Sequence, residues 1–222
     1  MSKVVLVFGS SKGIGKELTK IFSHEDFIVY GFSRSESDAG DNYFSHYLDL
    51  NSPSLKDDFI RLSAEIEKID YVVYNAGNIV VKPFEELSKS EILQCYQVNV
   101  LSAFEILQVC IPKMNKNGHI VLISSMGGFQ GTMKFPGLAA YSTSKAALAS
   151  LAELLAEEYK QSDFSVNCLC LGAVQTEMLE KAFPGYKAPH TASEMASFIK
   201  DFTVNKGAFF NGKIIPVSTT TP

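Results

Sequence analysis

The chain has 222 residues, of which 46% are hydrophobic and 20% are charged, a composition typical of a soluble globular protein with a substantial core. Its formal net charge of −4 provides no excess of basic side chains, so we expect neither nucleic acid nor an anionic membrane as a partner. The first apolar run is too short for a signal peptide and no stretch is as long as a membrane span, so we expect a cytoplasmic protein.

Short apolar runs rich in β-branched residues alternate along the chain with segments of helical composition. The predicted strands cover residues 3–9, 27–33, 43–50, 71–77, 119–125, 165–172 and 213–218. The predicted helices cover residues 14–23, 54–67, 90–111, 141–160 and 192–202. Near-continuous hydrophobicity in several strands indicates that helices cover both faces of the sheet. The alternation therefore predicts an α/β fold of βαβ units, one doubly wound parallel sheet of about seven strands in a single domain over residues 1–222.

The first predicted strand runs directly into a glycine-rich loop, GSSKGIG, that opens the first predicted helix. Gly9, Gly13 and Gly15 allow a tight turn and a close approach of a pyrophosphate to the free amides of the helix N-terminus. Their GxxxGxG spacing differs from the GxGxxG of the general dinucleotide-binding fold. A simple tight turn remains the alternative, but the place of the loop between strand and helix favours a nucleotide site.

The cysteines and histidines show no pattern of their own. Cys95, Cys110, Cys168 and Cys170 lack CxxC spacing, and the four histidines are scattered. We therefore expect buried free thiols and no metal site.

A tyrosine and a lysine begin the long helix predicted over residues 141–160. Tyr141 and Lys145 are spaced i,i+4, so they share one helix face and their polar ends can reach the same small volume. Taken alone, the pair favours a packed ring and a solvated amine, because Tyr and Lys at this spacing are frequent on helices, so the rest of the chain must decide.

Several motifs in a fixed order resemble those of the short-chain dehydrogenase/reductase family in its compact single-domain form. They are GSSKGIG at 9–15, DL at 49–50, YNAG at 74–77, Asn99, ISS ending at Ser125, YSTSK at 141–145 and VNCLCLGAVQT at 166–176. The resemblance covers nearly the whole chain. It implies a Rossmann-like fold and an oxidoreductase that uses a nicotinamide cofactor on a small-molecule carbonyl or alcohol, similar to 3-oxoacyl reductases and carbonyl reductases.

The resemblance also implies which residues hold the cofactor. Asp49 would bind the adenine amino group, the glycine loop the pyrophosphate, and Thr176 the nicotinamide carboxamide. The full implied set is Gly9, Ser11, Lys12, Gly13, Ile14, Gly15, Ser33, Arg34, Asp49, Leu50, Asn75, Ala76, Gly77, Tyr141, Lys145, Gly172 and Thr176.

The residues after the second predicted strand favour NADP(H) over NAD(H). An acidic residue there receives the ribose 2′-hydroxyl in NAD-specific sites, whereas an arginine accommodates a 2′-phosphate. This chain has Ser33 and then Arg34, with Lys12 in the glycine loop and Glu36 beyond the matching position. Two cations and a hydroxyl would bind a phosphate, although both cations also fit a solvated surface.

The family resemblance assigns the chemistry to four residues. Tyr141 would be the general acid, and Lys145 would lower its pKa from about 10 while holding the ribose hydroxyls. Ser125 would hydrogen-bond the substrate oxygen, and Asn99 would bend its helix and hold a water near Lys145. In isolation, a strand-end or capping hydroxyl is the favoured interpretation of Ser125 and an exposed helix residue that of Asn99, but the four residues together in family order favour the catalytic interpretation.

The chain departs from the family pattern around the expected substrate pocket. Leu171 replaces the usual proline before Gly172, and the segment between Ser125 and Tyr141 is longer than in many relatives. In that segment Phe129, Met133 and Phe135 either line the pocket or anchor the loop to the core. The covering segment 176–189 is short, which leaves the substrate poorly constrained.

The leading hypothesis is an NADPH-dependent reductase of a small or moderately apolar ketone. The alternatives are a cofactor-binding sensor or scaffold without turnover, and an epimerase or dehydratase, which would need a larger substrate domain. The resemblance implies a homodimer or homotetramer formed by the helices near 90–111 and 141–160. An apolar circumference at 146–156 supports this, but burial within one subunit explains the same pattern.

Overall fold

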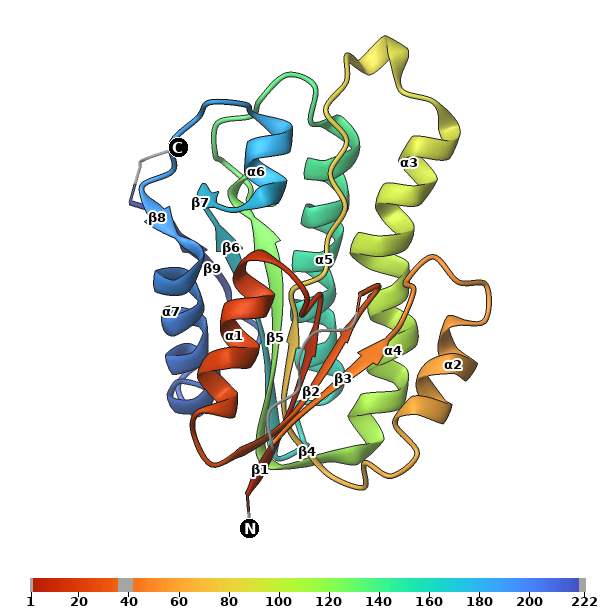
Figure 1. Cartoon of the computed structure of the whole chain (residues 1–222), viewed down its shortest axis with the longest axis vertical. Helices are drawn as coiled ribbons and strands as arrows, with labels where there is room; N and C mark the ends of the chain where they lie inside the picture. Colours follow the sequence, from red (N-terminus) through yellow and green to blue (C-terminus); the bar gives the residue numbers. More distant parts are fainter. Residues whose placement is uncertain (1, 36–41, 220–222) are drawn as a thin grey trace.

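A seven-stranded parallel sheet organises the computed structural model, which describes residues 2–35 and 42–219 (Figure 1). Glu36 lies outside the described residues. The strands are β1 (Lys3–Phe8), β2 (Phe27–Ser33), β3 (Tyr43–Tyr47), β4 (Ile69–Tyr74), β5 (Met114–Ser125), β6 (Phe164–Leu171) and β9 (Ile214–Val217). Their order is β3-β2-β1-β4-β5-β6-β9, and every neighbouring pair is parallel. This confirms the predicted Rossmann-like doubly wound sheet, whose strand order reverses between β1 and β4, where such folds bind ligands.

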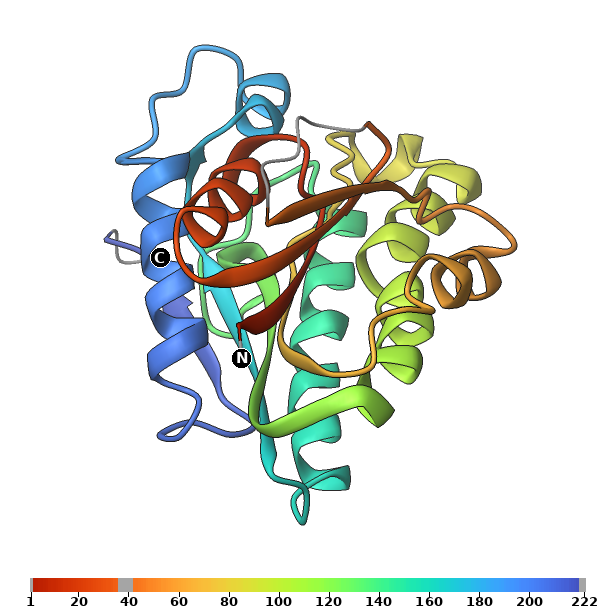
Figure 2. The ribbon, with the colours of Figure 1, turned by 60° about the horizontal axis from the view of Figure 1, so that its bottom comes forward.

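Helices cover both faces of the sheet (Figures 1 and 2). One face carries α1 (Gly13–Ser23) and α7 (Ala192–Asn205), and the other carries α2 (Leu55–Leu62), α4 (Ser102–Cys110) and α5 (Ala139–Glu158). Each layer has its own core cluster, with Leu18 and Ile199 in one and Phe59, Ile106 and Leu148 in the other. Burial on both faces explains why the strands are continuously apolar.

Several predicted boundaries are wrong by a few residues. The helix predicted over 90–111 is α3 (Lys89–Tyr96), a π-helical turn (Gln97–Leu101) and α4. The strands predicted over 43–50 and 71–77 end at Tyr47 and Tyr74, because the chain leaves the sheet there to form loops at its carboxyl edge. β5 begins earlier than predicted, at Met114.

Short elements complete the structure. Single 3₁₀ turns span Phe84–Glu86, Ile111–Lys113 and Met126–Gly128. The small α6 (Glu177–Ala182) and the two-residue strands β7 (Val174–Gln175) and β8 (His190–Thr191) lie beyond β6. In the part of the chain that the structure describes, none of the helices has the length and apolarity needed to span a bilayer.

The apolar circumference of α5 is explained mostly inside the subunit. Leu148, Leu151 and Ala152 are buried in the core, whereas Leu154 is 64% exposed. On the neighbouring α4 and the turn before it, Leu101 and Phe104 are also exposed. Single apolar side chains therefore remain exposed on these helices.

A buried histidine joins β5 to the last elements of the chain. His119 Nδ1 donates to Thr203 O at 3.0 Å, and its Nε2 accepts from Asn167 Nδ2 at 2.9 Å. Asn167 in turn donates to Phe210 O and accepts from Lys213 N, which fixes the orientation of its amide. Burial lowers the pKa of His119 to about 4, so the ring is neutral in the folded protein near neutral pH.

We expect this histidine to make the protein less stable as pH falls from about 6.5 to about 4. In that window the unfolded chain binds a proton at His119 and the folded chain does not, so unfolding is favoured by up to about 3 kcal/mol. Denaturant unfolding at several pH values measures it. The variant His119→Gln should flatten the slope, whereas His24→Gln, at an exposed position, should keep it. An unchanged slope in His119→Gln would refute the assignment.

Candidate active site

The glycine loop after β1 has the backbone geometry that requires glycine. Gly9 has a φ of +81°, and a Cβ on it would lie 2.8 Å from the Cα of Ala76. A Cβ on Gly15 would lie 1.9 Å from the carbonyl oxygen of Gly9. α1 therefore packs tightly against the end of β1, and its first turn is presented at the carboxyl edge of the sheet.

The N-terminus of α1 is suited to an anion. No side chain of the described residues caps it at Lys12, and its first turn contains no acidic residue. The first amides of a helix lack intrahelical partners, and the helix dipole favours negative charge there. The loop residues Ser11 and Ile14 flank this end of the helix and are half-buried.

The chain after β4 lies between the glycine loop and α5. Asn75 Nδ2 donates to Gly9 O at 3.2 Å, which ties the two loops together. Ala76 is buried, and a Cβ on Gly77 would lie 3.3 Å from Lys145 Nζ. The absence of a side chain at Gly77 thus leaves room beside the ammonium.

Asn99 is fully buried in the π-helical turn and is not an exposed helix residue. Its side chain donates to Asn78 O at 2.9 Å and to Ser144 Oγ at 2.8 Å, and it accepts from Asn78 N at 2.7 Å. The amide therefore joins the loop after β4 to α5, one residue before Lys145. Asn78 and Ser144 were not predicted, because neither has a spacing that distinguishes it from ordinary polar residues.

Tyr141 and Ser125 meet where β5 ends and α5 begins. The Ser125 hydroxyl accepts from Gly127 N at 3.2 Å, so it also caps a turn, and it hydrogen-bonds the Tyr141 phenol. Burial raises the pKa of Tyr141 to about 12, and the bond to Ser125 offsets only part of this. The phenol is therefore protonated at neutral pH.

The Lys145 ammonium hydrogen-bonds the main chain of β5. Lys145 is buried, its Nζ donates to Ile123 O at 2.9 Å, and burial lowers its own pKa to about 8. The pKa of Tyr141 is raised in this structure because burial of the phenol dominates, while the Lys145 ammonium hydrogen-bonds a main-chain carbonyl.

Three thiols surround this centre. All four cysteines are free and buried, as predicted. Cys95 Sγ lies 3.4 Å from Asn99 Nδ2, and Cys168 and Cys170 hydrogen-bond each other on β6. The sequence provided no signal for this convergence, because the thiols come from two elements that are distant in the chain, α3 and β6.

The residues predicted to bind the adenosine lie at the carboxyl edge near β2 and β3. Arg34 and Lys12 are exposed, and neither forms an ion pair with another described residue. The Ser33 hydroxyl donates to Ser35 O at 2.6 Å.

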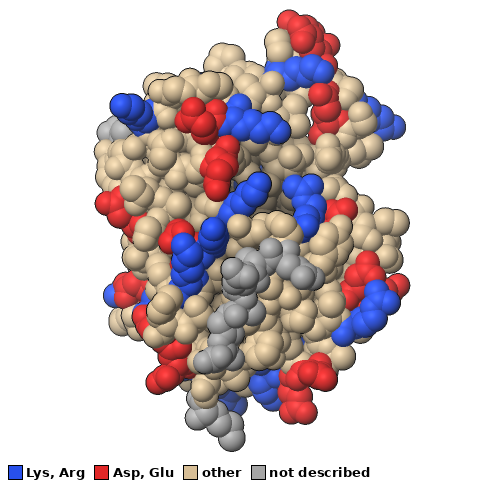
Figure 3. Space-filling view, viewed as in Figure 1, with Lys and Arg blue, Asp and Glu red and all other residues tan. Residues whose placement is uncertain are grey.

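The two residues predicted to lie near the adenine follow β3. Asp49 is half-buried and accepts from Asn51 N, and Leu50 O accepts from Gln97 Nε2. Figure 3 shows several Lys and Arg side chains gathered across the middle of the face that is seen in Figure 1.

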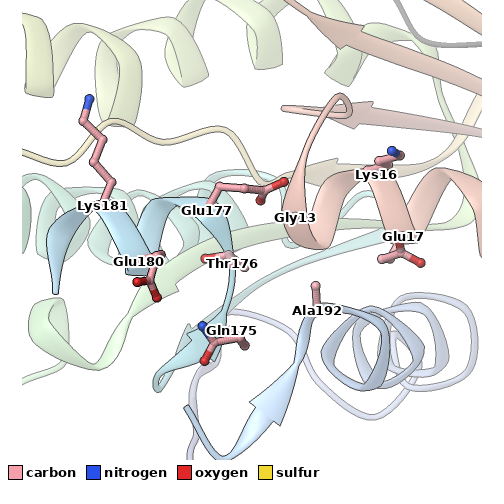
Figure 4. Close-up of a pocket in the computed structure, with 9 residues that line it drawn as sticks. All are labelled: Gly13, Lys16, Glu17, Gln175, Thr176, Glu177, Glu180, Lys181 and Ala192. Carbon is pink, nitrogen blue, oxygen red and sulfur yellow. The ribbon is translucent and has the colours of Figure 1, made fainter. Parts of the chain in front are cut away.

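The segment after β6 closes the other side of the glycine loop. Thr176 Oγ1 accepts from Leu179 N and caps α6, and its Cγ2 lies 3.2 Å from a Cβ built on Gly13. An open cavity of about 670 Å³ separates α6 from α1. Figure 4 shows its lining residues, Gly13, Lys16, Glu17, Gln175, Thr176, Glu177, Glu180, Lys181 and Ala192. Thr176 is therefore next to the glycine loop.

The departures from the family pattern have clear structural consequences. Leu171 is buried, and the following Gly172 donates its N–H to Val217 O at 2.9 Å, so the turn is held without a proline. In the loop between Ser125 and Tyr141, Phe129 packs against the core, which favours its role as an anchor. Met133 and Phe135 are more than half exposed.

A doubly wound sheet, a glycine loop at its switch point and a Tyr–Lys pair beside a serine together define a nucleotide-binding oxidoreductase. The family model described as short chain dehydrogenase matches residues 3–187. The chain belongs to the short-chain dehydrogenase family, a family that uses NAD(P) and acts on small molecules, and the predicted resemblance is confirmed.

Individual relatives agree with this assignment. The chain is 33% identical over 216 residues to the uncharacterized oxidoreductase YvrD of Bacillus subtilis, covering 92% of this chain and 81% of the relative. It is 30% identical over 199 residues to a benzil reductase ((S)-benzoin forming) of Saccharomyces cerevisiae, covering 80% and 74%. A short chain dehydrogenase from Shigella flexneri complexed with NADP superposes with a TM-score of 0.87 at 25% identity, over 96% of both chains.

Proposed function

We propose that this protein is an NADPH-dependent reductase that converts a ketone to an alcohol. The observation that carries the proposal is the meeting of the Tyr141 phenol with the Ser125 hydroxyl, next to the buried Lys145. A sensor without turnover would not need a protonated phenol held against a second hydroxyl. The named relative that reduces benzil supports a carbonyl substrate.

The residues present fit a nicotinamide dinucleotide. The uncapped N-terminus of α1 suits a pyrophosphate, and the missing side chain of Gly77 leaves space next to Lys145. Arg34 and Lys12, together with Ser33, would hold the 2′-phosphate. Asp49 would hold the adenine, Thr176 the carboxamide and Lys145 the ribose hydroxyls. When bound, the cofactor supplies the hydride.

The protein's own residues would supply the proton and orient the carbonyl. Ser125 would donate a hydrogen bond to the substrate oxygen and stabilise its developing charge. Tyr141 would then transfer its proton to that oxygen, and the raised pKa of the phenol keeps the proton available at neutral pH. Lys145, with a pKa near 8, is largely charged at pH 7 and would stabilise the phenolate that remains. Asn99 would keep the loop after β4 and α5 in register.

Steady-state reduction with a panel of ketones tests the proposed function. We expect oxidation of NADPH in the presence of benzil, 2,3-butanedione or simple aryl ketones, with stoichiometric formation of the alcohol. Tight binding of NADPH without turnover of any ketone would favour the sensor instead.

We also propose a cytoplasmic homodimer or homotetramer. The exposed apolar side chains Leu101, Phe104 and Leu154 on the π-helical turn, α4 and α5 support self-association through these helices. Sedimentation distinguishes these assemblies from a monomer.

A further inference from the structure

Lys134 holds together the loop that connects Ser125 to Tyr141. Its Nζ donates to Phe129 O at 2.6 Å, to Gly127 O at 2.9 Å and to Thr132 Oγ1 at 3.0 Å. Thr132 Oγ1 in turn donates to Met126 O at 2.6 Å. The loop therefore folds around one ammonium group, in a segment where the chain departs from its family.

This ammonium lies close to the proposed reaction centre. Gly127, whose carbonyl accepts from Lys134, donates its N–H to Ser125 Oγ at 3.2 Å. Gly127 and its two hydrogen bonds thus join the Lys134 ammonium to the Ser125 hydroxyl. This path places the two groups within about 10 Å of each other. The pKa of the Cys170 thiol is lowered mainly by its hydrogen bond with Cys168 and, to a smaller extent, by the charges of Lys145 and Lys134, and Cys170 in turn lies close enough to act on Tyr141.

The charge of Lys134 has no counter-ion within the described ranges 2–35 and 42–219, where none of the carboxylates lies within ion-pair distance of it. Its three hydrogen-bond acceptors are neutral, and the residue is exposed. Neutral carbonyls satisfy its donors without cancelling its charge. An uncompensated cation beside a substrate site attracts substrates that carry a negative charge.

We propose that Lys134 is a specificity residue that selects ketones carrying a carboxylate. The inference rests on the proposed carbonyl reductase function. A carboxylate would replace the neutral Thr132 hydroxyl, the most distant of the three acceptors, with a charge-assisted hydrogen bond. The ketone oxygen would bond to Ser125 and the carboxylate to Lys134, so both groups of the substrate must fit within the span of about 10 Å between the two side chains, which suits an oxo acid with a few carbons between ketone and carboxylate.

Matched pairs of a charged and a neutral ketone test this proposal. We would compare kcat/KM for 4-oxopentanoate with that for its methyl ester, and for 5-oxohexanoate with that for its methyl ester. The wild-type protein should prefer the acid roughly fivefold or more in at least one pair. Lys134→Met should abolish the preference, and Lys134→Arg should retain most of it. The ratio separates recognition of charge from support of the loop, because a loop defect lowers both members of a pair alike.

Lys68→Met is the matched control, since Lys68 is an exposed lysine just before β4, at the opposite edge of the sheet; it should keep the wild-type ratio. Pentanoate provides a second measurement with any neutral ketone that the enzyme reduces: it should inhibit the wild type more strongly than Lys134→Met. A wild-type ratio near one in both pairs, or a preference that survives in Lys134→Met, would overturn the proposal while leaving the reductase function intact. Failure to reduce any ketone, charged or neutral, would instead refute the proposed function on which it rests.

Discussion

The variant Tyr141→Phe should reduce ketones about 10²–10⁴-fold more slowly than the wild type and bind NADPH with nearly unchanged affinity. The substitution removes the only group that we place to deliver a proton to the substrate oxygen, and positioned general acids contribute about 10²–10⁴-fold. The ring itself remains and can keep its packing between Ser125 and the surrounding thiols. Turnover is measured by NADPH absorbance, and affinity by fluorescence titration.

Tyr159→Phe is the control for this variant. Tyr159 is at the other end of α5, where its ring lies against Phe164, so losing its hydroxyl should leave turnover and cofactor affinity near their wild-type values. Turnover by Tyr141→Phe at the wild-type rate would refute the proton-donor role. A parallel loss of NADPH affinity would indicate that the phenol mainly supports the cofactor site.

The sheet was predictable because its physical signal is local. Strands such as Val5–Phe8 are buried on both faces, so each appears in the sequence as an uninterrupted apolar run. The i,i+4 spacing of Tyr141 and Lys145 likewise fixes their shared helix face. Strand ends were less predictable: Asn75 to Gly77 follow the apolar run without a break, and their departure from the sheet depends on contacts with Gly9.

The detailed contacts of the site form between residues that are distant in the chain. The spacing of residues in the sequence does not reveal these contacts. Asn99 looks like an exposed polar residue in an ideal helix, and only the π-helical turn brings it inward to Asn78 and Ser144. The pKa of Tyr141 depends on burial, and the direction of the Lys145 ammonium depends on its hydrogen bond to the carbonyl of Ile123. Both are properties of packing, not of spacing.

Charge reversal at Arg34 should weaken NADPH binding by roughly 100-fold and leave NADH binding within a few-fold of the wild type. The arginine follows β2 directly, where a 2′-phosphate would lie, and it is exposed without an ion-pair partner among the described residues. Arg34→Glu removes charge-assisted hydrogen bonds worth about 2–3 kcal/mol and adds repulsion between a carboxylate and a phosphate. Titration with each cofactor measures both affinities.

The comparison between the two cofactors separates recognition of the 2′-phosphate from a general defect. NADH lacks that phosphate, and a glutamate near its 2′-hydroxyl can accept a hydrogen bond, so its affinity should hold or rise in Arg34→Glu. Arg61→Glu makes the same change in charge on α2, where Arg61 is exposed and paired with Asp58, and should leave the NADPH to NADH ratio unaltered. Equal losses for both cofactors in Arg34→Glu would refute the preference for NADP(H), because they would show that Arg34 supports the site without contacting the 2′-phosphate.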